Sequence, residues 1–303
     1  MDPTVSNCCR TLNENLKLAL LVRKFDVFYW QIDSPTFDVD FADLFSDTFS
    51  NLKNLEKLTF GCGRQKPDYF DVIAPQTFPN LRYLHVHVRS HAAQLVECFL
   101  QVHPHLLTLN LPWRAPADVA SSFTRVKLPA LRRLSTNATV FPLLVRAHPA
   151  LKSTEVRWKK TRKPLAPPIA ALHASSCESL RHLVCSGPRA NVDLIQLVAA
   201  QLPALTVLRV LASAPAGPLH NEATVQVIAA VLAQLPKLRV FEYRYTLGHE
   251  YTLEDGYIPS ADRRAVRAMV TAWGQACPTL KRCDLNGVTW KRPTTGKWRP
   301  MEM

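Results

Sequence analysis

The stretch that decides the fold is Pro79-Asn80-Leu81-Arg82-Tyr83-Leu84-His85-Val86. Its pattern is a proline, one further residue, a leucine, two residues, an apolar residue, one residue and a second apolar residue. The phrase returns as Pro203-Ala204-Leu205-Thr206-Val207-Leu208-Arg209-Val210 and, without the proline, as Lys53-Asn54-Leu55-Glu56-Lys57-Leu58-Thr59-Phe60. Alternating apolar residues are typical of a short strand with one buried face. We therefore expect a fold built from a repeated short strand.

This repeat phrase occurs nine times, and a proline precedes its first leucine by two positions in seven of the nine copies. Successive first leucines lie 20 to 42 residues apart, and most steps fall between 20 and 29. That period is typical of leucine-rich repeats, and the two longest steps indicate insertions. The first leucines are Leu55, Leu81, Leu106, Leu131, Leu151, Leu180, Leu205, Leu238 and Leu280.

The segments between the phrases have helical periodicity. Apolar residues recur at helical spacing in residues 41–52, 225–235 and 266–273. A polar residue suited to cap a helix precedes several of these segments, and the proline that follows ends the helix. The candidate N-caps are Ser90, Asn191, Asn221 and Ser260.

The sequence thus predicts an α/β leucine-rich-repeat solenoid, or horseshoe, of about nine degenerate repeats, with a parallel inner sheet and outer helices. Residues 1–30 are expected to form an N-terminal cap helix and the first strand. Residues 31–289 are expected to form the solenoid, and residues 290–303 a basic C-terminal tail that caps it. One continuous solenoid replaces the two domains that the chain length alone would favour.

The phrases and two terminal stretches resemble the leucine-rich-repeat region of fungal, basidiomycete-type F-box proteins. Residues 15–27 look like the first segment after the F-box in that group, where a helix ends and the first strand begins. Residues 277–298 look like its last repeat, with Asn286-Gly287-Val288-Thr289-Trp290 and Trp298. The resemblance covers nearly the whole chain.

The resemblance implies the substrate-receptor part of a ubiquitin ligase. An F-box opens with a Leu-Pro-x-Glu-like phrase and docks onto the adaptor of a cullin-based ligase. No such phrase is found, and residues 1–12 are too few and too polar to contain one. A cullin-ligase adaptor is therefore expected as a partner only if an F-box exists upstream.

Charge is distributed unevenly along the chain. Residues 1–100 contain ten Lys and Arg against twelve Asp and Glu, whereas residues 101–303 contain 27 against 12, a net charge of +15. The excess of positive charge favours an acidic partner. Composition excludes global disorder, and neither a secretory signal nor a membrane span is found. We expect an intracellular protein in the cytoplasm, the nucleus or both, with reduced cysteines in its core.

The concave face of the expected sheet is the candidate partner-binding surface. Side chains alternate between the two faces of a strand, so the polar residue between the apolar positions of each phrase points to this face. Solenoids bind partners on such faces, although any one residue could be merely solvated. The candidates are Thr59, His85, His87, Asn110, Glu155, Arg157, Arg209, Glu242, Arg244 and Asp284.

Two basic segments leave alternatives open. The run that contains Lys159, Lys160, Arg162 and Lys163 could be a solvated loop, a nuclear import signal, or a contact to RNA or an acidic partner. The tail places basic residues beside Trp290 and Trp298, which could stack on bases or fold back to cap the last repeat. The alternative function is a nuclear leucine-rich-repeat protein that binds RNA or an acidic partner through the basic C-terminal two-thirds of the chain.

Catalysis has no support in the sequence. It contains no G-x-S-x-G, no glycine-rich phosphate loop and no H-E-x-x-H, so neither an enzyme nor a cofactor is expected. His85, His87 and His91 could suit a metal by spacing, but they lack a fixed fourth ligand. Ordinary surface histidines are the favoured interpretation. The sequence predicts a non-enzymatic protein-recognition module.

Overall fold

The computed structural model describes most of the chain, which divides into two compact units, Met1–Ala150 and Leu151–Met303. The described residues are 3–29, 39–62, 70–88, 92–112, 123, 125–145, 150–158, 165–176, 178–188, 191–212, 222–245, 263–285, 287–293 and 296–301.

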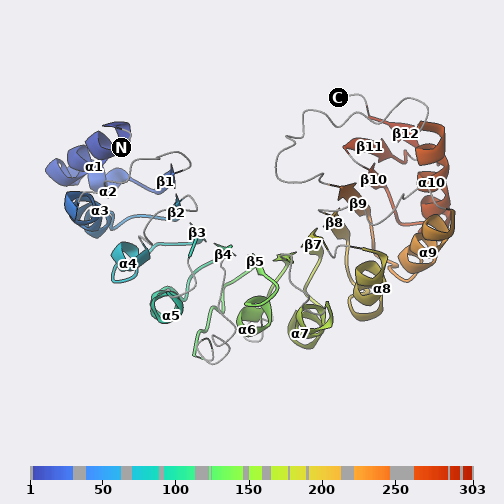
Figure 1. Ribbon diagram of the computed structural model, residues 1–303, viewed down its shortest axis with the longest axis horizontal. Helices are drawn as coiled ribbons and strands as arrows, with labels where there is room; N and C mark the ends of the chain where they lie inside the picture. Colours follow the sequence, from blue (N-terminus) through green and yellow to red (C-terminus); the bar gives the residue numbers. More distant parts are fainter. Residues whose placement is uncertain are drawn as a thin grey trace. The chain divides into compact units, whose positions relative to one another are not determined.

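The first unit alternates strands and helices after a helical start. Its strands β1 to β5 pair in chain order and in parallel, and its helices cover one face of the sheet (Figure 1). The elements are α1 (Pro3–Glu14), α2 (Leu16–Leu21), β1 (Lys24–Tyr29), α3 (Val39–Asn51), β2 (Lys57–Cys62), α4 (Phe70–Ile73), β3 (Tyr83–Val86), α5 (Ala93–Gln101), β4 (Thr108–Leu111), β5 (Arg133–Asn137) and α6 (Phe141–Val145).

The second unit repeats this alternation and then closes with a hairpin. Strands β6 to β10 are parallel and in chain order, whereas β11 pairs antiparallel with β10, and β12 antiparallel with β11. The elements are β6 (Ser153–Arg157), α7 (Ala166–Ser176), β7 (His182–Gly187), α8 (Val192–Gln201), β8 (Val207–Ala212), α9 (Glu222–Leu232), β9 (Val240–Tyr245), α10 (Arg263–Ala276), β10 (Arg282–Leu285), β11 (Val288–Lys291) and β12 (Arg299–Pro300).

The expected class, mixed α/β with a mostly parallel sheet and helices, is confirmed. Each of the nine repeat phrases contains one strand, β2 to β10, and equivalent positions are paired across neighbours: Leu58 with Leu84, and Leu208 with Phe241. The expected helices are α3, α9 and α10. Asn191 caps α8, because its side-chain oxygen accepts a hydrogen bond from the backbone N–H of Leu194 at 3.2 Å. Ser90, Asn221 and Ser260 lie outside the described residues.

The first leucine of every repeat phrase lies in the core. All nine are at most 1% exposed, and they pack on the helix side of the sheet. Burying one leucine side chain stabilises a fold by about 1.5–3 kcal/mol, and deleting it costs roughly 2–5 kcal/mol. The first leucine of each repeat phrase is therefore explained by its packing in the core.

The recurring proline has a specific place in each connection. In six phrases it is the second residue of a four-residue turn, which closes when the N–H of the first leucine donates to the carbonyl three residues earlier. The N–H of Leu81, for example, donates to Phe78 O at 3.0 Å, across Pro79 and Asn80. Proline fits this position because its fixed φ matches the turn. It therefore directs the chain from helix into strand.

Four cysteines, Cys9, Cys185, Cys277 and Cys283, are buried free thiols as expected, but Cys8 and Cys98 are exposed. Burial raises the pKa of Cys185 and Cys283, so both stay protonated. Among the described residues, no helix has both the length and the apolar composition needed to cross a bilayer.

Candidate partner-binding face

The strands of both units expose alternate side chains on the face opposite the helices. In β3, β4 and β6, partly exposed residues alternate with buried ones, and the buried set faces the helices. We call the opposite surface the helix-free face. The ten residues predicted for the concave face all lie on it, because each occupies an outward position of its strand, or directly follows it for His87.

On the helix-free face of the first unit, polar side chains form a row across the strands. Paired neighbours in the register place Asp26, Thr59, His85, Asn110 and Ser135 side by side. Thr59 is only 3% exposed. The Oδ1 atom of Asn110 is buried and accepts no hydrogen bond within the described part of the chain.

Asp26 at the edge of that row is ionised. Its Oδ1 atom lies 3.0 Å from Lys57 Nζ. Burial alone would raise the pKa of this carboxyl, but the nearby Thr59 hydroxyl, the hydrogen bond from Lys57 and the charges of Lys57 and Lys24 outweigh it and lower the pKa. Because both partners of this pair are about one third or more exposed, the pair contributes little to stability.

His85 and His87 share the face, with ring centroids 5.2 Å apart. Across the described residues, no group of three or more His, Cys, Asp or Glu side chains is placed to hold a metal ion. His91, the third candidate, lies outside the described residues. The pair is therefore part of the polar surface of the first unit.

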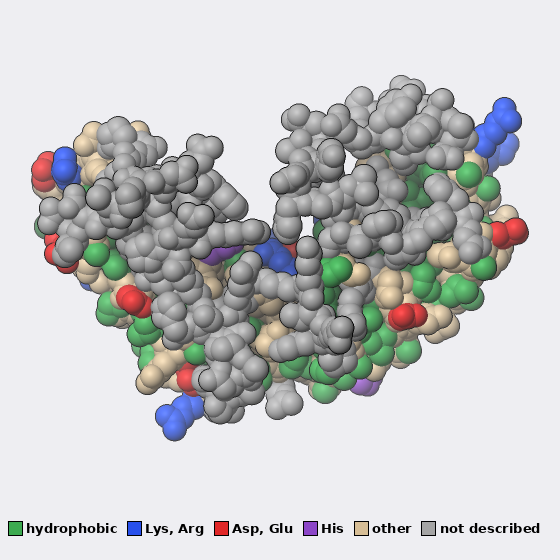
Figure 2. All heavy atoms as spheres, in the orientation of Figure 1, with side chains coloured by type: hydrophobic (Ala, Val, Ile, Leu, Met, Phe, Trp, Pro, Cys, Tyr) green, Lys and Arg blue, Asp and Glu red, His purple; other side chains and the backbone are tan. Residues whose placement is uncertain are grey.

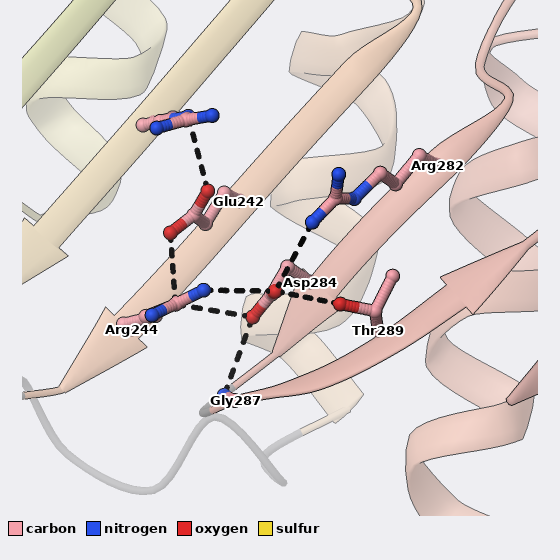
Figure 3. A network of polar contacts seen from close by, with 7 residues as sticks. Glu242, Arg244, Arg282, Asp284, Gly287 and Thr289 are labelled. Carbon is pink, nitrogen blue, oxygen red and sulfur yellow. Dashed lines mark hydrogen bonds and ion pairs between the residues drawn. The ribbon is translucent and has the colours of Figure 1, made fainter. Parts of the chain in front are cut away.

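On the helix-free face of the second unit, charged side chains form a connected network (Figure 3). Glu242 on β9 accepts from two arginines: Arg209 Nε lies 3.1 Å from its Oε2, and Arg244 Nε lies 2.8 Å from its Oε1. Arg244 also donates through Nε and Nη2 to the two oxygens of Asp284 on β10, at 3.2 and 3.0 Å. Three neighbouring strands are thus linked by two carboxylates and their arginines.

Asp284 has a complete set of donors. Besides Arg244, the backbone N–H of Gly287 donates to its Oδ1 at 3.2 Å and the hydroxyl of Thr289 to its Oδ2 at 2.9 Å. Arg282 lies at the edge of this set, with Nη2 3.8 Å from Oδ2. These donors compensate for the burial of the carboxylate, because only 1% of its side chain is exposed.

Arg244 holds the network together. Burial alone would lower its pKa, but the hydrogen bonds to Asp284 and the charges of Asp284 and Glu242 raise it. Removing Arg244 would leave Glu242 and Asp284, 7% and 1% exposed, without their shared cation. Breaking a buried pair in this way costs roughly 3–5 kcal/mol.

The arginines form the outer layer of this network and the carboxylates the inner one. The side chains of Arg209, Arg282 and Arg244 are 47%, 41% and 29% exposed, in contrast to Glu242 and Asp284. A similar pair stands on β6, where Arg157 donates through Nε and Nη2 to Glu155 at 2.7 and 3.1 Å. A partner that approaches this face therefore meets guanidinium groups first.

The two predicted basic segments have different outcomes. Lys159, Lys160, Arg162 and Lys163 lie outside the described residues, and Trp158 beside them is buried. In the tail, Trp290 and Trp298 are 3% and 4% exposed, so they pack into the protein instead of offering stacking surfaces. On the face shown in Figure 2, Lys and Arg side chains are visible at several separate places.

Sequence reasoning missed two members of the network. Arg282 lies two residues before Asp284 in β10, outside the row of positions predicted to bind a partner. Thr289 lies on β11, which belongs to no repeat phrase. Alignment of the repeat phrases could have identified Arg282, because it pairs with Val240 in the same register that pairs Asp284 with Glu242. Neither the family models nor the curated proteins compared with this chain gave a match.

Proposed function

We propose that this chain is a non-enzymatic protein-recognition module that binds its partner on the helix-free face. One observation carries the proposal: outward positions of the repeat phrases form in-register polar rows on a parallel sheet whose other face is packed with leucine. A packed scaffold beneath variable outward residues is the arrangement of repeat proteins that bind partners. The proposed setting is intracellular, in the cytoplasm or the nucleus.

The finer form of the fold belongs to the same proposal. We infer that the nine phrases form a leucine-rich-repeat solenoid, with the helix-free face as its concave surface. The repeat length, the nine buried first leucines and the strand-by-strand register support it. In such a solenoid the partner would contact several strands at once.

The resemblance to fungal F-box proteins supports a role in a ubiquitin ligase. In that role the helix-free face would select the substrate, and an F-box would contact the cullin adaptor. Affinity purification from the cells that make this protein is expected to recover cullin-ligase subunits. Their consistent absence from the purified material would contradict this part of the proposal without affecting partner binding.

An alternative function, binding of RNA or another acidic nuclear partner, is favoured by charge. Residues 151–303 contain 21 Lys and Arg against 11 Asp and Glu, a net charge of +10. Phosphate contacts release counterions, so RNA binding would weaken steeply between 50 and 200 mM salt. RNA binding that shows no salt dependence would contradict this alternative.

Affinity capture of the binding partner with matched surface variants of this protein tests the main proposal. His87→Glu and Val184→Glu alter partly exposed residues of the helix-free face, one in each unit. Leu95→Glu and Val227→Glu add the same charge to exposed positions of α5 and α9, which are 37% and 38% exposed.

We expect the same partner to be retained by the wild-type protein and the helix variants and lost, by about tenfold or more, from the face variants. Quantitative mass spectrometry of the captured material measures this. Equal retention by the two sets of variants would place the binding surface elsewhere and would contradict the proposal.

A further inference from the structure

Three arginines of the second unit are paired with carboxylates on the same face. Arg157 is fixed by Glu155, Arg209 by Glu242, and Arg244 by Glu242 and Asp284. A flexible arginine loses rotamer entropy when it binds, whereas a guanidinium already held by a carboxylate loses less. The ion pairs therefore prepare this face for binding.

These arginines keep unused hydrogen-bond donors. A guanidinium has five N–H donors. Arg157 donates to Glu155 through Nε and Nη2, and the closest contact of Arg209 with Glu242 is through Nε, so among the described residues Nη1 of Arg157 has no acceptor. Nη1 of Arg244 likewise has no acceptor among the described residues. The free Nη groups are the ones able to meet a second carboxylate.

The residues between the arginines are compatible with a bound peptide. In the strand register, Arg157, Ser186, Leu211 and Arg244 form one row, and Val184 and Arg209 belong to the row beside it. Ser186, Leu211 and Val184 are partly exposed and uncharged. Uncharged residues thus lie between Arg157 and Arg244, and the neighbouring row runs from Glu155 through Val184 and Arg209 to Glu242.

The spacing of the row sets a length for the ligand. Neighbouring strands lie about 4.8 Å apart, so Arg157 on β6 and Arg244 on β9 are separated by roughly 14 Å across the sheet. An extended chain advances about 3.3–3.6 Å per residue, so roughly four residues cover that distance. Acidic side chains about four positions apart could therefore meet both arginines, and one between them could meet Arg209.

We propose that the helix-free face of the second unit binds an extended segment of a partner protein rich in Asp and Glu, through Arg157, Arg209 and Arg244. This inference rests on the proposed function and names the chemistry of the partner at that same face. Carboxylates are the expected ligands because a planar guanidinium binds them with two parallel hydrogen bonds.

A labelled ten-residue glutamate peptide tests the inference, with ten-residue glutamine and uridine oligomers as competitors of the same length. The variant Arg157→Gln/Arg209→Gln removes two guanidinium groups and leaves Glu242 paired with Arg244. The control, Arg264→Gln/Arg267→Gln, removes the same charge from exposed positions of α10. Circular dichroism is the check that both variants keep their secondary structure.

Fluorescence anisotropy in the full-length chain is expected to show glutamate-peptide binding that the face variant weakens about thirtyfold or more, and the α10 control less than threefold. Absence of binding to the wild-type chain, or equal weakening in the two variants, would overturn the inference. Preference for the uridine oligomer, lost in the face variant, would replace the acidic peptide with RNA. If capture still depends on His87 and Val184 while the glutamate peptide does not bind, the inference fails and the proposed function stands.

Discussion

At the scale of single residues, His103 is a buried side chain whose hydrogen bonds fix its protonation. Its Nδ1 atom donates to Phe99 O at 2.7 Å, so Nε2 is free of a proton and accepts from the N–H of Phe78 at 2.9 Å. The ring also packs against Phe78 and Phe99. The neutral His103 ring, which lies next to the following repeat phrase, therefore binds the backbone N–H at the start of the turn that contains Pro79.

Burial lowers the pKa of His103, and the hydrogen bond to Phe99 offsets this only in part. Because the unfolded chain takes up a proton more readily, stability is complete above about pH 6.5 and declines as the pH falls below that value. We expect the free energy of unfolding to rise between pH 5 and pH 7.5, and to rise less steeply in His103→Gln. Urea unfolding of both proteins at several pH values measures this; identical slopes would contradict it.

At the scale of elements, the C-terminal hairpin is bound to α10 through a close contact with Gly274. A Cβ atom at Gly274 would lie 2.4 Å from Trp298 Nε1, and Arg292 Nη1 donates to Gly274 O at 2.9 Å. With β11 paired to β10, these contacts cover the last parallel strand. The sequence suggested such a cap from the two tryptophans, but the hairpin carries no repeat phrase and its strands were not predicted.

Gly274→Ala tests this contact, because the sign of its effect on the free energy of unfolding depends on whether the contact exists. In an open helix the change would stabilise the protein by about 1 kcal/mol, because alanine is the better helix former. Here we expect it to lower the free energy of unfolding by roughly 1–3 kcal/mol, since Trp298 must move. In a Trp298→Ala background the same change should become stabilising. Denaturant unfolding measures both, and stabilisation in the wild-type background would contradict the contact.

The elements differ in how far the sequence predicted them. The strands of the repeat phrases were predictable because apolar alternation and the turn proline are local signals, as at Leu81 and Leu205. The outward direction of Glu242 and Asp284 followed from the same alternation. Their burial did not, because it depends on Arg244 and Thr289, which different strands bring into contact. Helix α2 lies within the segment expected to form the N-terminal cap, but its exposure pattern was not predicted: it buries Ala19 and exposes Leu16, Leu18, Leu20 and Leu21.

At the scale of the whole molecule, the two units share one plan but carry different outward chemistry. The helix-free face of the first unit presents mostly neutral polar groups around Thr59, His85 and Asn110, whereas that of the second presents arginines over buried carboxylates. The positive charge of the chain follows this division, with the larger excess in residues 151–303. We therefore propose recognition through the helix-free face and place the preference for an acidic partner in the second unit.

Site-specific photo-cross-linking tests the central claim, recognition through the helix-free face, most directly. A benzophenone side chain placed at His87 or Val184 reports on that face, and the same group at Leu95 or Val227 reports on the helices. Irradiation with the captured partner is expected to give adducts from the two face positions and few or none from the helix positions. Adducts that form from Leu95 and Val227 but not from His87 and Val184 would contradict the claim.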